Sequence, residues 1–156
     1  MFDLDIPGFG RLSLNHLVLD FNGTLARDGA LIPGVAERLA ALSQVLTVRV
    51  VTADTFGTVR IVLAGLPLTV EVLKPGAEDQ AKLALVEGLG AASCAAMGNG
   101  RNDRLMVQAA GLGMAVLGPE GASPATLAAA TVTVPHVCVG LDLLLHPKRL
   151  LATLRA

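Results

Sequence analysis

Apolar residues in this chain form short runs typical of buried strands, and these runs alternate with segments that have helical spacing. The runs 2–6 and 11–19 flank Pro7-Gly8-Phe9-Gly10, a combination that predicts a turn between two strands. A helix is predicted from Pro33-Gly34 to about Gln44, with Val35, Leu39 and Leu42 as its apolar stripe. Further strands are predicted at residues 45–51, 67–73, 93–97, 112–117 and 131–134. Further helices are predicted at residues 56–64 (capped by Thr55), 78–89, 103–110 and 123–130, and after Val137 with an interruption at Pro147.

Strands and helices therefore alternate along the whole chain, and the loops between them are short. This order is typical of an α/β fold in which helices cover both faces of a parallel sheet. At 156 residues the chain is expected to form a single domain spanning residues 1–156, with a hairpin at its N-terminus.

The composition is strongly apolar, with 53% hydrophobic and 16% charged residues, against about 25% charged in an average soluble domain. The chain has four Phe and no Trp or Tyr, so its core must be mainly aliphatic. This apolar surplus predicts exposed apolar patches and therefore a homo-oligomer. A net charge of -1 provides no basic surface for nucleic acid or an anionic membrane, and neither partner is expected.

Cys94 and Cys138 are too few and too far apart for a disulfide framework or a zinc site. The N-terminus has no basic segment of the kind that begins a signal peptide. The uncharged stretch 121–141 contains Pro124 and Pro135, which argue against a membrane span. The sequence thus predicts a soluble, cytoplasmic protein.

Polar residues follow three of the predicted strands at their carboxyl ends. Asp20 and Asn22 follow the first, Thr52 follows the second, and Asn99 and Asp103 follow a third. Ligands of open α/β sheets bind beyond these strand ends, so the three groups are expected to meet in one site. Carboxylates, a hydroxyl and backbone amides together suit a magnesium ion bridged to a phosphate.

These residues resemble the motifs of the haloacid dehalogenase superfamily of hydrolases. The stretch 20–25 (DFNGTL) is similar to the first motif, D-x-D-G-T-L, and 98–103 (GNGRND) to the fourth, G-D-G-x-N-D. Residues 50–52 (VVT) resemble the second motif and Lys82 the third. The form of the fourth motif is most similar to the phosphorylation domain of P-type ATPases. The resemblance covers residues 14–145 and implies a three-layer, Rossmann-like fold. The gaps between the motifs are filled by core elements, so no cap domain is expected.

The resemblance implies a Mg²⁺-dependent phosphohydrolase that acts on a phosphorylated substrate through an aspartyl-phosphate on Asp20. The implied catalytic residues are Asp20, Asn22, Thr52 and Lys82. The implied phosphate-binding residues are Gly23, Thr24, Thr52, Ala53 and Lys82. The implied metal ligands are Asp20, Asn22 through its carbonyl, Asn99 and Asp103, with Asn102 supporting the loop.

Two amides depart from the family pattern. Asn22 occupies the position of an acid that transfers protons, and Asn99 removes one negative charge from the metal site. General acid–base catalysis is typically worth about 10²–10⁴-fold, so weak activity is expected. The alternative is a catalytically impaired regulatory module that binds phosphate or accepts a phosphoryl group. Both amides precede glycine (Gly23 and Gly100), a context open to deamidation, which would restore the acids.

Three side chains have two interpretations each. Lys74 competes with Lys82 for the role of the site lysine. Asp54 either caps a helix or borders the site, and Arg101 either faces a substrate anion or is a solvated loop residue.

Overall fold

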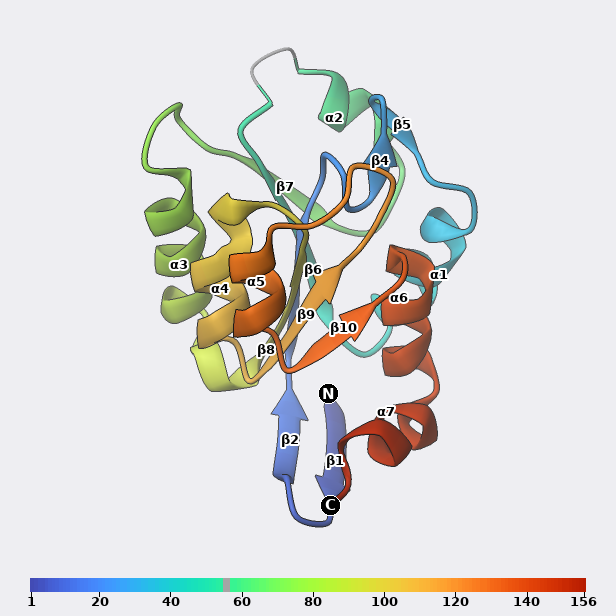
Figure 1. The fold of residues 1–156 in the computed structure, drawn as a ribbon. Helices are drawn as coiled ribbons and strands as arrows, with labels where there is room; N and C mark the ends of the chain where they lie inside the picture. Colours follow the sequence, from blue (N-terminus) through green and yellow to red (C-terminus); the bar gives the residue numbers. More distant parts are fainter. Residues whose placement is uncertain (55–56) are drawn as a thin grey trace.

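The structure is a computed structural model that describes residues 1–54 and 57–156. Within these residues six parallel strands form one sheet, as predicted (Figure 1). In spatial order the strands are β10 (Val132–Val134), β9 (Leu112–Val116), β8 (Cys94–Gly98), β3 (His16–Asp20), β6 (Thr47–Thr52) and β7 (Thr69–Val72). The strand order reverses around β3, which therefore lies in the middle of the sheet.

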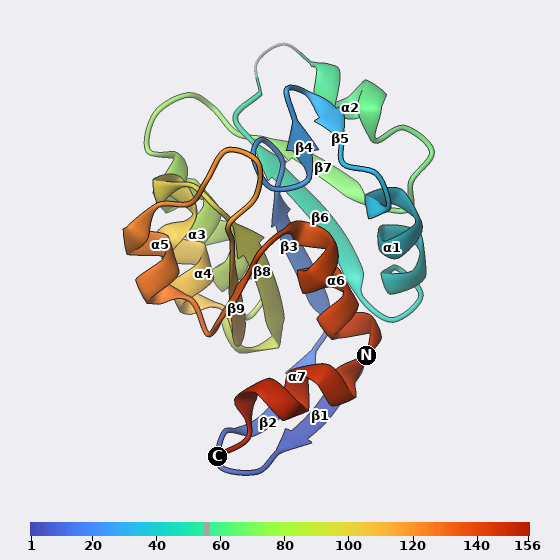
Figure 2. The same ribbon diagram turned by 45° about the vertical axis from the view of Figure 1, so that its right-hand side comes forward.

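Helices cover both faces of the sheet (Figures 1 and 2). One face is covered by α1 (Val35–Leu42) and α6 (Val137–Leu145). The other is covered by α3 (Glu78–Gly88), α4 (Arg104–Ala109) and α5 (Pro124–Ala129). Helix α7 (Pro147–Leu154) packs beside the N-terminal strand, and α2 (Thr58–Val62) lies beyond the carboxyl ends of the strands. Two single turns of 3₁₀ helix, η1 (Ala91–Ser93) and η2 (Arg101–Asp103), flank β8.

Two apolar clusters hold the three layers together, and β3 contributes to both. Leu17 and Leu19 pack into the cluster beneath α1 and α6, whereas Val18 packs with Val86 of α3 and Met106 of α4. Successive side chains of a strand point to opposite faces, so a central strand must be apolar at every position. This explains why an unbroken apolar run precedes Asp20.

The predicted N-terminal hairpin is present as β1 (Phe2–Ile6) and β2 (Gly10–Leu14). The predicted strand 11–19 is divided, because its first part pairs with β1 and its second part enters the main sheet as β3. The C-terminus closes on this hairpin, where the Ala156 N–H donates to the Pro7 carbonyl at 3.1 Å.

Two local elements differ from the prediction. Residues 26–32, for which no helix or strand was predicted, contain a short hairpin of β4 (Ala26–Arg27) and β5 (Ala30–Leu31). Asp28 and Gly29 both have positive φ, as a two-residue hairpin turn requires. The predicted helix 56–64 is the shorter α2, and its predicted cap, Thr55, lies outside the described residues.

No cap domain interrupts the described chain, because the connections between the strands hold only these small elements and the layer helices. Every helix in residues 1–54 and 57–156 is too short or too polar to span a bilayer.

Candidate active site

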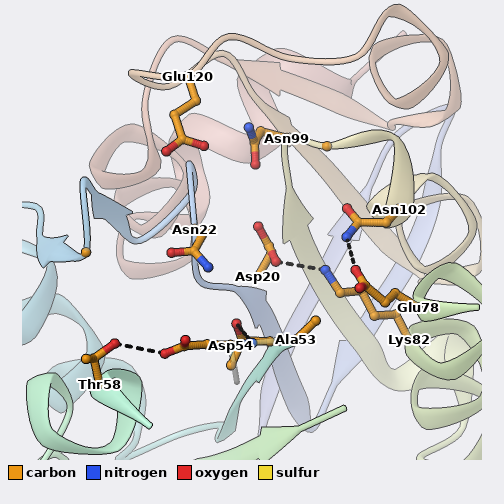
Figure 3. Close-up of a pocket in the computed structure, with 13 residues that line it drawn as sticks. Asp20, Asn22, Ala53, Asp54, Thr58, Glu78, Lys82, Asn99, Asn102 and Glu120 are labelled. Carbon is orange, nitrogen blue, oxygen red and sulfur yellow. Dashed lines mark hydrogen bonds and ion pairs between the residues drawn. The ribbon is translucent and has the colours of Figure 1, made fainter. Parts of the chain in front are cut away.

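A pocket of about 600 Å³ lies at the carboxyl ends of β3, β6 and β8 (Figure 3). Seven of the ten predicted site residues line it, so the strand ends converge as expected. These are Asp20, Asn22, Thr52, Ala53, Lys82, Asn99 and Asn102. The lining also includes Gly29 of the β4–β5 turn, Asp54, Thr58, Glu78, Gly100 and Glu120.

The centre of the site is an ion-pair cluster of two carboxylates and one ammonium group. Lys82 Nζ donates to Asp20 Oδ1 at 2.8 Å and to Asp103 Oδ1 at 2.6 Å. The Lys82 side chain is 1% exposed, and its long stem crosses from α3 to the end of β3. Lys74 is exposed and does not line the pocket. The structure therefore places Lys82, and not Lys74, beside Asp20.

Burial and like charge set the electrostatics of this cluster. Burial, followed by the charge of Asp103, raises the pKa of Asp20 to about 7, although Lys82 and the Thr24 hydroxyl oppose the rise. Burial lowers the pKa of Lys82, but the two carboxylates outweigh it and the net shift is upward. One ammonium cannot neutralise two ionised carboxylates, so the ionised cluster carries an excess negative charge in a poorly solvated place.

Asp103 is fully buried, and its oxygens bond within the protein. Its Oδ2 accepts the Asn99 N–H at 3.0 Å and the Gly100 N–H at 2.9 Å, while Oδ1 accepts from Lys82. A Cβ at Gly98 would lie 2.4 Å from the Asp103 carboxyl carbon, so this close approach requires glycine. Asp103 does not line the pocket of the described residues, and its bonds position Lys82 and the loop after β8. Its expected role as a metal ligand stays a prediction.

The Thr24 hydroxyl lies between two buried oxygen atoms. Its Oγ1 is 3.2 Å from Asp20 Oδ2 and 3.1 Å from Asn99 Oδ1, in donor geometry to both. A hydroxyl has one hydrogen, so one of the two acceptors is always left without a donor from Thr24. The site thus has more acceptor oxygens than hydrogen-bond donors, as expected of a site that binds a cation through oxygen ligands.

Gly23 and Thr24, which were expected to bind phosphate, lie behind the pocket lining of the described residues. The Gly23 N–H donates to the Ala26 carbonyl at 3.0 Å, and Thr24 is fully buried. Both residues therefore shape the turn after β3, and their expected role in binding phosphate stays a prediction.

The end of β6 supplies the opposite wall of the pocket. Thr52 Oγ1 accepts the Asp54 N–H at 3.1 Å, which leaves the hydroxyl hydrogen of Thr52 to be donated elsewhere. Asp54 Oδ2 accepts from the Thr58 hydroxyl at 2.9 Å and from the Val59 N–H at 3.2 Å. The Asp54 carboxylate thus binds the first turn of α2, whose N-cap residue is Gly57, and Asp54 also borders the pocket.

Hydrogen bonds to two helices hold the loop after β8 in place. Asn102 Nδ2 donates to Glu78 Oε2 at 2.9 Å, and the Thr126 hydroxyl donates to the Gly100 carbonyl at 2.7 Å. Arg101 is exposed and lines a separate hollow beside α3, so it does not face the pocket.

Glu120 is a pocket residue that the sequence analysis did not identify. It follows β9, and its carboxylate is directed toward Asn22 and Asn99 in Figure 3. A carboxylate shortly after a strand of a parallel sheet was the available signal, because the carboxyl end of β9 faces the same side as those of β3 and β8.

The donor set fits a small divalent cation. Magnesium is usually held by one or two carboxylates, with water and substrate oxygens completing its octahedron. Asp20 Oδ2 and Asn99 Oδ1 are two oxygen ligands of this kind, because the Thr24 hydroxyl can donate to only one of them at a time. No group of three or more His, Cys, Asp or Glu in the described residues forms an all-protein metal site. The oxygens of Asn22 and of the substrate would therefore have to contribute.

Comparisons with known structures identify the fold. The chain resembles a magnesium- and phosphate-bound 3-deoxy-D-manno-octulosonate 8-phosphate phosphatase of Moraxella catarrhalis, with a TM-score of 0.69 and 20% identity over 91% of this chain and 94% of that one. It also resembles a putative haloacid dehalogenase superfamily hydrolase of Legionella pneumophila, with a TM-score of 0.72 and 22% identity over 90% and 87% of the two chains. A cobalt-bound octulosonate phosphatase of Haemophilus influenzae gives a TM-score of 0.69 and 16% identity over 88% and 90%. The resemblance to P-type ATPase phosphorylation domains remains a prediction.

Comparison with other sequences identifies a relative. No protein-family model matches the chain. The chain is 41% identical over 86 residues to the uncharacterized protein MJ0073 of Methanocaldococcus jannaschii, a match that covers 53% of this chain and 92% of that protein. The chain therefore belongs to the same family as MJ0073, and its fold is that of the haloacid dehalogenase-like hydrolases.

Proposed function

We propose that the chain is a Mg²⁺-dependent phosphohydrolase that forms an aspartyl-phosphate on Asp20. The observation that carries the proposal is the placement of Asp20. It is 7% exposed, lines a pocket at the carboxyl ends of parallel strands, and is paired with the nearly inaccessible Lys82. The phosphatases of similar fold support the same reaction class.

In the first step an oxygen of Asp20 attacks the phosphorus of a phosphate ester, and the bond from phosphorus to the leaving oxygen breaks. Lys82, which is paired with Asp20, and Thr52, which lines the same pocket, donate to the phosphoryl oxygens, on which negative charge accumulates. A bound Mg²⁺ would neutralise phosphate charge and lower the repulsion between Asp20 and its substrate. Asp20, Asn22 and Asn99 are the residues that would hold it.

In the second step water attacks the phosphorus, the acyl phosphate bond breaks, and Asp20 is released together with inorganic phosphate. An amide has no titratable proton, so Asn22 can neither protonate the leaving oxygen nor take a proton from this water. Both proton transfers then fall to solvent. We expect formation of the aspartyl-phosphate to be fastest with good leaving groups, and its hydrolysis to be slow.

The charge of the pocket narrows the substrate class. Its described lining carries the carboxylates of Asp20, Asp54, Glu78 and Glu120 and only one cationic group, Lys82. A substrate with a further negative charge would be repelled by this wall. We therefore expect phosphate monoesters of neutral or cationic alcohols to be better substrates than esters that also carry a carboxylate.

Turnover measurements on wild type and Asp20→Asn test the proposal. The substrates are acetyl phosphate and an aryl phosphate, with Mg²⁺ or with EDTA. We expect Mg²⁺-dependent release of phosphate from wild type and none from the variant. Equal rates in the two proteins would reject Asp20 as the nucleophile.

The second candidate function is a phospho-accepting or phosphate-binding regulatory module, and the amide at position 22 favours it. Such a module would incorporate up to one phosphoryl group per chain and then stop, or would bind beryllofluoride without turnover. Multiple turnovers per chain distinguish the phosphohydrolase from this module.

A further inference from the structure

The surroundings of residue 99 favour an amide side chain over a carboxylate. Asn99 Nδ2 donates to the Gly121 carbonyl at 3.0 Å, and this bond directs Asn99 Oδ1 toward Thr24 and Asp20. A carboxylate at position 99 would place an anionic oxygen against the Gly121 carbonyl. The Asn99 amide therefore matches the Gly121 carbonyl of the loop after β9. An acid at position 99 would lose this hydrogen bond and reduce the stability of the fold.

The same loop carries a carboxylate into the pocket. An ideal Cβ on Gly23 would lie 2.6 Å from Glu120 Oε2 and 2.7 Å from Asn99 Nδ2, so these two side chains approach the turn after β3 together. Gly23 has a φ of 76°, and the absence of a side chain there makes room for Glu120. Figure 3 shows Glu120 and Asp54 on opposite sides of Asn22, with the Glu120 carboxylate directed toward Asn22.

No hydrogen bond or ion pair to the Glu120 carboxylate is found among residues 1–54 and 57–156. Glu120 nevertheless lines a pocket that also holds the carboxylates of Asp20, Asp54 and Glu78 and, within the described lining, one cationic group, Lys82. Like charges repel, and Glu120 is exposed, so a carboxylate without a partner is expected to turn toward solvent and away from the other acids. Its inward orientation is explained if a cation lies between it and Asp20.

We propose that Glu120 provides the carboxylate that the cation site lacks because position 99 carries an amide. The negative charge is then contributed by the loop after β9 instead of the loop after β8. Glu120 binds the ion directly or through one water, which is compatible with magnesium's preference for few carboxylates and several waters. The inference rests on the proposed phosphohydrolase function, whose cation site it completes.

Cation binding to the metal-free protein tests the inference without any substrate. Mn²⁺ is added as a probe, and the free ion is measured by electron paramagnetic resonance for wild type, Glu120→Gln, Asn99→Asp and the double variant. Glu120 is exposed, so the Gln variant is expected to fold normally. Glu78→Gln is the matched control, because Glu78 lines the same pocket but is bonded to Asn102.

We expect Glu120→Gln to weaken Mn²⁺ binding by about 10-fold or more, and Glu78→Gln by less than about threefold. Asn99→Asp should restore affinity in the Glu120→Gln background and change it little in the wild-type background, because the two positions supply the same charge. The inference is overturned if Glu120→Gln binds Mn²⁺ as wild type does, or if wild type does not bind it.

Phosphorylation of Asp20 is measured separately, so the two proposals can fail independently. If Asp20 is phosphorylated but Mn²⁺ affinity does not depend on Glu120, the inference fails and the proposed function stands. If Mn²⁺ affinity depends on Glu120 but Asp20 is never phosphorylated, the phosphohydrolase proposal fails and the cation site stands.

Discussion

The ammonium group of Lys82 lies 2.8 Å from the Asp20 carboxylate, and both residues are buried and line the pocket. The same ammonium lies 2.6 Å from Asp103, so a single cation holds two acids that would otherwise repel one another. The three side chains come from α3, β3 and η2, and their contacts join β3 and the loop after β8 to α3.

Lys82→Met removes the only cation of this cluster and leaves two buried carboxylates facing each other. Breaking a buried ion pair typically costs about 3–5 kcal/mol, and we expect a loss of unfolding free energy of that order at pH 8. The measurement is denaturation by urea. Adding Asp20→Asn to the Lys82→Met variant should recover part of the loss. A single variant within about 1 kcal/mol of wild type would contradict the prediction.

The raised pKa of Asp20 predicts a pH dependence of stability in the metal-free protein. The folded state holds this proton with a pKa of about 7, against 3.8 for an aspartate in an unfolded chain, so the folded protein binds it more tightly than the unfolded chain does. The stabilising contribution is complete below about pH 4 and is lost as the pH rises through 7.

Urea denaturation in EDTA from pH 4.5 to pH 8 measures this effect, with Asp20→Asn as the reference. We expect the stability of wild type relative to the variant to fall with rising pH by an amount on the order of a few kcal/mol. Parallel curves for the two proteins would show that Asp20 does not titrate in this range.

Asn22→Asp is predicted to accelerate turnover. Asn22 is exposed and lines the pocket beside Asp20, so an acid there can reach both the leaving oxygen and the attacking water. General acid–base catalysis is worth about 10²–10⁴-fold, and we expect a gain of that order in hydrolysis of the aspartyl-phosphate. Asn22→Ser is the control and should gain nothing. If Asn22→Asp is no faster than the control, proton transfer does not limit the reaction.

The hydrogen bonds of the folded protein argue against deamidation as a route to the missing acids. Deamidation requires the following glycine nitrogen to attack the amide, but the Gly23 N–H is bonded to Ala26 and the Gly100 N–H to Asp103. We expect the intact mass of the folded protein to stay constant on ageing, whereas urea-unfolded protein gains mass. Conversion of Asn22 or Asn99 at the unfolded rate would contradict this.

The pattern of apolar residues predicted the sheet, its helical layers and the N-terminal hairpin. The pattern that identifies each strand or helix lies within one short segment of the chain. The apolar stripe of Val35, Leu39 and Leu42 is buried on α1 as predicted. The β4–β5 hairpin was missed even though Asp28-Gly29 is a common hairpin dipeptide, because each strand has only two residues.

Site residues at the ends of strands were predictable from the sequence. The directions of side chains on the loops were less predictable. Asp20 and Thr52 lie at strand ends and reach the pocket. The inward orientation of Asp103 and Thr24 and the approach of Glu120 depend on contacts between loops that are distant in sequence. No periodic pattern in the sequence records such contacts.

The central claim is that Asp20 accepts a phosphoryl group, and mass spectrometry of the intact protein tests it most directly. Wild type, Asp20→Asn and Asn22→Ser are incubated with acetyl phosphate and Mg²⁺, quenched in acid, and the modified residue is mapped after borohydride reduction. We expect one phosphoryl group on wild type and on Asn22→Ser, located at Asp20, and none on Asp20→Asn. An unmodified wild type, or a modified Asp20→Asn, would contradict the account.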